Sequence, residues 1–304
     1  MTQRAHRPIG GIGITSPCGL ERLRLFRKGS YQEDDGSVIR KWTSGRELWA
    51  RVSAAVSGFF WLFLFMGLID LVVPVDETPG FYDSYLLETG WGVLYTFLVG
   101  AAFVSLALRP GMVMPPAQVV LVAVCVAVTA LAAGSWVQVV PAILLAMNGC
   151  AFLVLARRRG RLRKSWDRPA LDPVVGSAAV VLVPPAVLFA IDMIIGYREG
   201  RPPLDDDTLG IDHWPMQAAW ALALAAVALA VAAGVRARWS GTGLSGGCVA
   251  AAAAWFGYWS VVYPNHAGSA GATWGLALIG WALVFTVAVG WRLGAQREPA
   301  TAAR

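Results

Sequence analysis

The sequence predicts an all-α protein, a polytopic transmembrane bundle of about eight helices. The composition, the mean hydropathy and the placement of the charges support this fold class. Hydrophobic residues make up 57% of the 304 residues and charged residues 14%, the mean hydropathy is +0.56, and the charges fall in short segments between apolar runs. Soluble domains carry about 25% charged residues. The net charge of +6 does not indicate a nucleic-acid partner, because the basic residues are not spread over one face of a folded domain.

Residues 1–47 are polar and rich in arginine, and we expect a flexible, basic cytoplasmic segment. Glycines at 10, 11 and 13 do not indicate a dinucleotide-binding loop, since no strand pattern precedes them and no helix pattern clearly follows. No apolar h-region lies near the start, so the first span is predicted to act as its own insertion signal. The four cysteines form no CxxC pair, and we expect free thiols.

Residues 48–292 form the predicted transmembrane domain. A bilayer core about 30 Å thick needs about 20 apolar residues per helix, and runs of about that length recur here. The predicted spans lie near residues 48–73, 91–108, 116–133, 135–156, 173–197, 215–235, 243–263 and 272–291. Little more than Gly134-Ser135 separates the third span from the fourth, so a re-entrant hairpin over 116–156 is the main alternative there. Residues 293–304 are a predicted cytoplasmic tail.

Arginine and lysine predict the orientation, because loops rich in them stay in the cytoplasm. With eight spans, the basic segments all fall on one side of the membrane and the acidic loops on the other. The basic positions are the amino-terminal segment, Arg109, the run from Arg157 to Lys164, Arg236, Arg238, Arg292, Arg297 and Arg304. Both termini are therefore predicted to be cytoplasmic, in a bacterial cytoplasmic membrane. The run from Arg157 to Lys164 also predicts attraction of anionic lipid, by about 1 kcal/mol per charge.

Two spans end with a similar pattern. Ile69-Asp70-Leu71 closes the first, Ile191-Asp192-Met193 closes the fifth, and each precedes a long acidic loop. Four spans separate the two patterns, so a repeat, if the patterns mark one, would be a parallel repeat of four plus four spans. The alternative is that apolar helices resemble one another and often end in an acid.

The candidate substrate-binding residues are Asp70, Asp192 and Asp212. A charged side chain inside a bilayer costs roughly 2.5 to 3.5 kcal/mol, so an acid in a span is a functional-site hypothesis. His213 and His266 are candidate ligands for zinc or another divalent metal, since imidazole with carboxylate is a usual mixed set. The two histidines do not share a helix and no HExxH pattern occurs, so helix capping or loop hydrogen bonding is the alternative. No cofactor is required by the sequence.

The segments around these histidines carry a resemblance. Asp-His-Trp-Pro opens a span at 212–215, and Tyr-Pro-Asn-His-Ala-Gly-Ser precedes the last span at 263–269. This region, mainly 212–274, resembles a set of uncharacterised multi-pass membrane proteins of high-GC Gram-positive bacteria. The resemblance implies a membrane location and a span pattern. It implies no activity and carries no functional residues over.

Further residues within the spans are predicted to be structural. Pro184 and Pro185 lie in mid-membrane, where they remove helix hydrogen bonds and predict a kink; a kink that lines a transport site is the functional alternative. Asn148 is predicted to bridge helices by hydrogen bonding. Gly271 and Gly275 match the small-residue pattern that brings helices close together.

The architecture and the acidic outer face favour a transport or solute-binding protein. No strong catalytic motif is present, which argues against an enzyme. A noncatalytic membrane assembly partner is the first alternative, and a metal-dependent enzyme at the outer face is the second. The lipid bilayer is the predicted partner, and the sequence indicates no particular protein partner.

Overall fold

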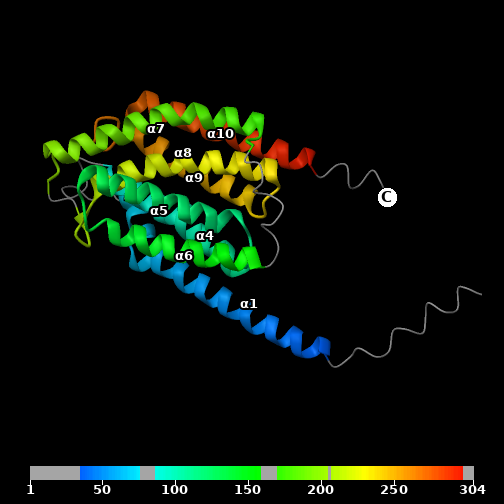
Figure 1. Cartoon of the computed structure of the whole chain (residues 1–304). Helices are drawn as coiled ribbons and strands as arrows, with labels where there is room; N and C mark the ends of the chain where they lie inside the picture. The colour runs from blue at the N-terminus through cyan, green and yellow to red at the C-terminus, as the bar shows by residue number, and fades with distance from the viewer. Residues whose placement is uncertain (1–34, 76–85, 159–169, 205–206, 297–304) are drawn as a thin grey trace, which may run out of the picture. The chain divides into compact units, whose positions relative to one another are not determined.

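The structure is a computed structural model that describes residues 35–75, 86–158, 170–204 and 207–296. The chain divides into two units, residues 1–46 and 47–304, and the second unit contains the helical bundle (Figure 1). Most of the predicted amino-terminal segment, the run from Arg157 to Lys164 and the end of the predicted tail lie outside the residues whose side chains are described.

Long helices joined by short connections make up the described chain. The helical elements are α1 (Asp35–Phe59), η1 (Phe60–Leu64, π-helical), α2 (Gly67–Val72), η2 (Val73–Val75, 3₁₀), α3 (Leu87–Val93), η3 (Leu94–Gly100, π-helical), α4 (Ala101–Leu108), α5 (Met114–Ala133), α6 (Val139–Arg158), α7 (Pro173–Glu199), α8 (His213–Ala237), α9 (Thr242–Val262) and α10 (Gly271–Ala295). A two-stranded antiparallel hairpin, β1 (Asp207–Thr208) with β2 (Ile211–Asp212), precedes α8. The predicted all-α fold class is confirmed.

Seven helical stretches among the described residues are long and apolar enough to cross a bilayer. They coincide with the predicted spans other than 243–263. That span corresponds to α9, which has 21 residues, none of them charged. Glycine, serine and aromatic residues lower the mean hydropathy of α9, so α9 is not one of these seven stretches.

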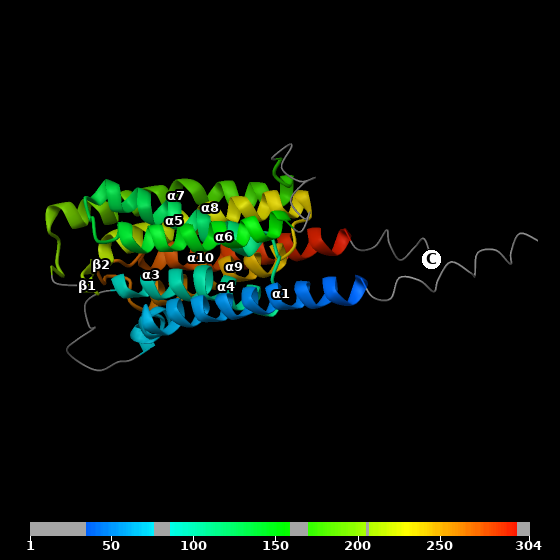
Figure 2. The ribbon, with the colours of Figure 1, turned by 60° about the horizontal axis from the view of Figure 1, so that its bottom comes forward.

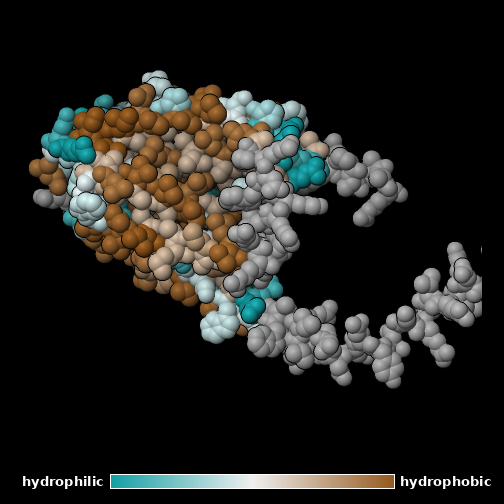
Figure 3. All heavy atoms as spheres, viewed as in Figure 1, coloured by the Kyte–Doolittle hydropathy of each residue, from teal (hydrophilic) through white to brown (hydrophobic). Residues whose placement is uncertain are grey.

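Burial distinguishes central helices from peripheral ones. The most apolar windows of α8 and of the stretch Leu87–Leu108 are 72% buried, against 28% for α7 and for α10. The central helix α8 packs against α5, α7 and α9. On the peripheral helices large apolar side chains point outward, including Val181 (68% exposed) and Val287 (70% exposed). Figure 3 shows such hydrophobic surface over the face of the bundle in view, as expected for a surface that contacts lipid.

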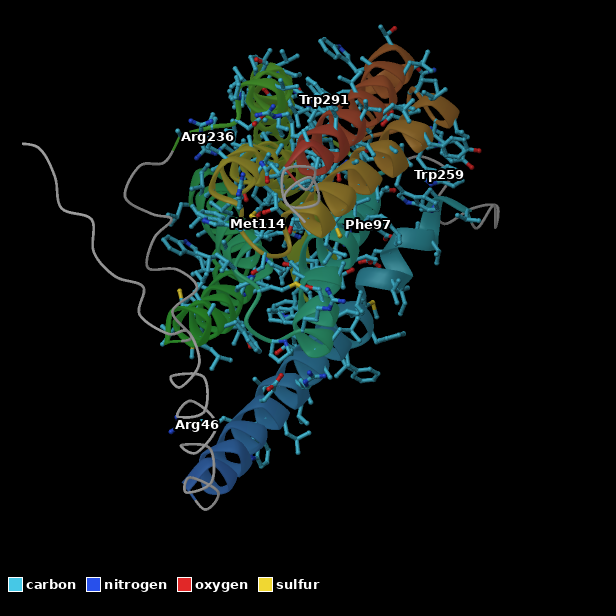
Figure 4. The ribbon with its side chains drawn as sticks, turned by 90° about the vertical axis from the view of Figure 1, so that its right-hand side faces the viewer. Arg46, Phe97, Met114, Arg236, Trp259 and Trp291 are labelled. Carbon is cyan, nitrogen blue, oxygen red and sulfur yellow. The ribbon has the colours of Figure 1, made fainter. Side chains whose placement is uncertain are left out.

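Hydrogen bonds identify the two ends of the bundle. At one end, the amides of Val113 and Met114 donate to the Ser240 carbonyl and the Asp172 amide donates to the Ala232 carbonyl. We call this the basic end, because Arg109, Arg236, Arg238 and Arg292 lie in the last turns or connections of α4, α8 and α10 there. Figure 4 looks onto it and labels Met114, Arg236 and Trp291.

At the opposite end, the Leu86 amide donates to the Ala267 carbonyl, and the Trp214 indole donates to the Pro203 carbonyl. The β1–β2 hairpin and the start of α3 lie at this end (Figure 2). Among the described residues, Arg109, Arg236, Arg238 and Arg292 therefore gather at one end of the bundle, as the alternation of basic and acidic loops predicted, while Arg198 and Arg201 lie at the other end.

The first predicted span, 48–73, is interrupted rather than continuous. Met66 adopts a left-handed conformation with φ of 61°, and it separates η1 from α2. The Phe65 carbonyl next to the break accepts a hydrogen bond of 2.9 Å from the Trp91 indole. The rings of Phe65 and Trp91 also stack, with centroids 5.0 Å apart. This tertiary contact leaves no trace in local hydropathy, which is why the sequence predicted one uninterrupted helix.

The third and fourth predicted spans form two full helices. α5 and α6 have 20 residues each, the length that a complete crossing requires. Gly134, with φ of 83°, ends α5, and the chain reverses so that α6 runs back along it (Figure 1). The geometry therefore favours two spans over a re-entrant hairpin.

Candidate functional site

A groove of about 590 Å³ lies between α7, α8, α9 and α10. Ligand pockets in proteins occupy about 300 to 1,000 Å³, so the groove has room for an organic molecule. Aliphatic and aromatic side chains form most of its wall, and Asp192 is the one ionisable group among the described residues that line it. We call it the Asp192 groove.

Three aromatic rings form the floor of the Asp192 groove. Trp220 of α8 and Phe256 of α9 have ring centroids 4.1 Å apart, and they are 3% and 1% exposed. Phe189 of α7 meets both rings edge-on, at 6.3 Å from Trp220 and 5.8 Å from Phe256. These close-packed rings, one from each of α7, α8 and α9, limit how deeply a ligand can enter the groove.

Trp281 of α10 closes the groove on the side nearer the basic end. Its indole donates a hydrogen bond of 2.8 Å to the Ala178 carbonyl of α7, and its ring stacks on Phe285 at 4.8 Å. This hydrogen bond links α10 to α7 at the level of Trp281. Farther toward the opposite end, Leu188 and Trp274 line the groove and are 68% and 61% exposed, so the groove opens sideways onto the lipid-facing surface.

Pro184 and Pro185 lie in the α7 wall of the groove. Proline has no amide hydrogen, so the carbonyls four residues earlier, on Val180 and Val181, lose their usual helical donors. Helix α7 nevertheless runs through both prolines to Glu199. The structure thus places the predicted proline pair beside a candidate binding site, where Val181 also forms part of the wall.

Asp192 belongs to a cluster of three charges at the opposite end. An Arg201 guanidinium nitrogen lies 2.9 Å from an Asp192 carboxylate oxygen, and another lies 3.0 Å from a Glu199 oxygen. Hydrogen bonds to Asp192 and Glu199 raise the pKa of Arg201 above its ordinary value. Two carboxylates and one guanidinium leave a net charge of −1, and the Asp192 side chain remains 56% exposed.

The backbone after α7 explains why Arg201 returns to Asp192. Gly200 takes the left-handed conformation with φ of 66° and ends the helix. The Arg201 amide then donates to the Gly196 carbonyl over 2.9 Å, which folds the chain back over the last turn.

Asp70 lies in a different environment from Asp192. It is 3% exposed and sits on α2, which packs against α3, whereas α7 packs against α8 and α10. A Cβ atom added to Gly92 would lie 2.5 Å from the Asp70 carbonyl carbon, so glycine is what lets α2 rest on α3. The two predicted acids therefore occupy unlike surroundings, one buried and one exposed, despite their similar sequence context.

Asp212 and His213 start α8. The Asp212 Oδ1 accepts a hydrogen bond of 2.9 Å from the Trp214 amide, the geometry of an N-cap. His213 is 1% exposed, its Nε2 lies 2.9 Å from the Thr208 hydroxyl, and its ring meets Trp91 edge-on at 5.4 Å. These contacts match the helix-start interpretation of the segment.

His266 lies in the connection between α9 and α10, with its ring 4.7 Å from that of Tyr263. Over the described part of the chain, no three His, Cys, Asp or Glu side chains come together in a way that could hold a metal ion. Around His213 and His266 the described side chains therefore do not supply a full ligand set for zinc, and the metal site stays a prediction.

Asn148 and the glycines of α10 have packing roles. The Ser57 hydroxyl of α1 donates to the Asn148 Oδ1 of α6 over 3.1 Å. A Cβ on Gly275 would lie 2.6 Å from the Gly257 carbonyl of α9, so the two helix backbones touch there. Gly271 acts differently, because its φ of 79° starts α10 in a left-handed conformation.

At the basic end, Asp172 connects three of the helices that form the groove. Its Oδ1 accepts from the amides of Val174 and Val175 at the start of α7, and its Oδ2 lies 2.7 Å from an Arg292 nitrogen of α10. Its amide bonds to the Ala232 carbonyl of α8. Burial alone would raise the pKa of Asp172, but the hydrogen bond from Arg292 and those from the two amides lower it below the ordinary value.

No protein-family model, curated protein or solved structure matches this chain.

Sequence reasoning missed two elements of this geometry. Arg201 was not predicted to pair with Asp192, although an arginine shortly after a membrane acid, here Arg198 or Arg201, is a usable signal for an ion pair. Trp220, Phe256 and Trp281 gave no signal, because tryptophan and phenylalanine are frequent throughout the chain. Asp172 followed by Pro173 does carry the local signature of a helix start.

Proposed function

We propose that this protein is a solute-binding protein of the bacterial cytoplasmic membrane, with a transport-like architecture, that takes an apolar or amphiphilic molecule from the bilayer into the Asp192 groove. The observation that carries the proposal is the groove itself, about 590 Å³ in volume, apolar in its wall and open toward the lipid-facing surface. A water-soluble polar solute would find one carboxylate and few other partners there.

The energetics support an apolar occupant. Each methylene group removed from water contributes about 0.8 kcal/mol, but a molecule already dissolved in lipid gains little from that source. Its preference for the groove must come from close packing against the aromatic floor and from polar contacts at Asp192. The rigid contacts among Phe189, Trp220 and Phe256 provide a preformed surface for such packing.

The first test fills the groove from its α10 wall. Ala277 lines the groove and is exposed, so Ala277→Phe should occupy the space without disturbing the core. Ala251→Phe, at an exposed α9 position that does not line the groove, is the matched control. A lipid with a diazirine in its acyl chain is photolysed in vesicles containing each variant, and the attachment sites are mapped by peptide mass spectrometry.

We expect wild type and Ala251→Phe to be labelled at groove positions such as Val181 and Leu278, and Ala277→Phe to lose at least five-sixths of that labelling. Equal labelling of the groove and of other lipid-facing helices in all three proteins would refute the proposed binding function.

A further inference from the structure

The length of the Asp192 groove matches one leaflet of a bilayer. On α7 its lining extends from Val181 to Asp192. These residues are eleven positions apart, which corresponds to about 16 Å of helix at 1.5 Å per residue. Half of a hydrocarbon core about 30 Å thick is about 15 Å. The groove therefore offers an apolar chain about the length that one acyl chain of a lipid occupies.

Polar groups gather where the head group of such a molecule would lie. Asp192 and Ser269 line the groove at this end, and Trp274 lines it from the first turn of α10. The rest of the lining is apolar apart from backbone and indole groups. The groove thus has a long apolar part and one polar end, which matches the structure of an amphiphile.

The charge of the polar end selects among head groups. Arg201 is already shared between Asp192 and Glu199, and the three groups together carry a net charge of −1. An anionic head group would meet this excess of negative charge. An ammonium group would instead form a charge-assisted hydrogen bond with the exposed part of the Asp192 carboxylate. The Trp274 ring would favour the same cation.

The contacts of Arg201 leave room for a phosphate as well. Its Nη1 donates to Asp192, and its Nε and Nη2 both lie 3.0 Å from a Glu199 oxygen, so one N–H on each Nη remains of the five that an arginine carries. A head group with both an amine and a phosphate could therefore address Asp192 with the first and Arg201 with the second. A quaternary ammonium has no N–H to donate, so a primary amine suits the carboxylate better.

We propose that the occupant of the Asp192 groove is a membrane lipid whose head group carries a primary amine, with one acyl chain along α7 and the amine on Asp192. This inference rests on the proposed binding function and specifies its ligand class.

The test compares phosphatidylethanolamine, phosphatidylcholine and phosphatidylglycerol of identical acyl chains. Delipidated protein is equilibrated with mixed micelles containing all three, and native mass spectrometry counts the retained lipids. Asp192→Asn removes the carboxylate on the groove, whereas Asp207→Asn removes an exposed carboxylate that does not line the groove and serves as the matched control. Ala277→Phe reports on the groove itself, and each variant is checked for monodispersity and for an unchanged Tm.

We expect wild type and Asp207→Asn to retain phosphatidylethanolamine at least fivefold over phosphatidylglycerol, and Asp192→Asn to bring this ratio below twofold while still retaining lipid. The amine assignment would be overturned if wild type retained all three lipids equally, or if Asp192→Asn left the ratio unchanged. In both cases Ala277→Phe should still abolish retention. Undiminished retention in Ala277→Phe would instead overturn the binding function on which the assignment rests.

Discussion

Asp172 combines two roles in one side chain. One carboxylate oxygen caps α7 and the other binds Arg292, and the residue is 0% exposed while the Arg292 side chain is 29% exposed. Removing one partner of a buried ion pair costs about 3 to 5 kcal/mol, and an exposed pair contributes about 0 to 1 kcal/mol. Because Arg292 is partly solvated, this pair lies between the two limits.

Substitution separates the two roles of Asp172. Asparagine caps helices as well as aspartate does, so Asp172→Asn should lose the ion pair alone, about 1 to 2 kcal/mol. Asp172→Ala should lose about 1 kcal/mol more, because the cap disappears as well. The measurement is thermal or denaturant unfolding of the detergent-solubilised protein. Equal stability of the two variants would show that the cap contributes nothing.

The same residue predicts a pH dependence. The pKa of Asp172 is lower in the folded protein than its ordinary value of 3.8. A lowered folded pKa means that the contribution to stability is complete above the ordinary value and is lost as the pH falls through the folded pKa. The stability difference between wild type and Asp172→Asn should therefore be constant near neutral pH and shrink below about pH 4. A difference that grows on acidification would contradict the ion pair.

At the scale of elements, the contact between α9 and α10 determines one wall of the groove. Gly275 touches Gly257 across the helix pair, and its neighbours Trp274 and Leu278 line the groove. The spacing of the two backbones thus controls where the α10 side chains of the groove lie.

Gly275→Ala should force these helices apart, since the new Cβ would lie 2.6 Å from a backbone carbonyl that has no flexible end to move. We expect a loss of about 1 to 3 kcal/mol, the range for overpacking, together with weaker lipid labelling in the groove. Gly280→Ala on the same helix is the control, because a Cβ there meets nothing within 4 Å. Unfolding curves that coincide for the two variants would argue against the close contact.

Local patterns predicted the elements better than they predicted the site. The spans and the Asp212 cap follow from hydropathy and from a helix-start signature that a few adjacent residues contain. The break at Met66 and the groove floor depend on Phe65 meeting Trp91 and on Trp220 meeting Phe256, contacts between residues far apart in the chain. Asp70 and Asp192 show the limit most directly, because similar sequence neighbours gave one buried and one exposed carboxylate.

At the scale of the whole molecule, the distribution of charge predicts the orientation in the membrane. The connections at the basic end carry Arg109, Arg236 and Arg238, whereas the opposite end carries Glu199, Asp207 and Asp212. Loops rich in arginine remain in the cytoplasm, so we expect the basic end there and the head-group end of the groove on the outer side.

Cysteine labelling tests this placement. In a variant whose four native cysteines are replaced by alanine, Arg236→Cys and Leu204→Cys put one exposed thiol at each end. A membrane-impermeant maleimide added to intact cells should label Leu204→Cys, and it should label Arg236→Cys only after permeabilisation. The reverse pattern would place the basic end outside.

The sideways opening of the Asp192 groove affects how its affinity has to be expressed. A ligand that enters from the bilayer is diluted by other lipids and not by water, so the relevant concentration is its mole fraction in the membrane. Saturation would then depend on the lipid composition of the host membrane and not on the volume of the assay. A detergent with an alkyl chain would compete with the ligand for the groove. Affinities measured in micelles and in nanodiscs should therefore differ for the same protein and ligand.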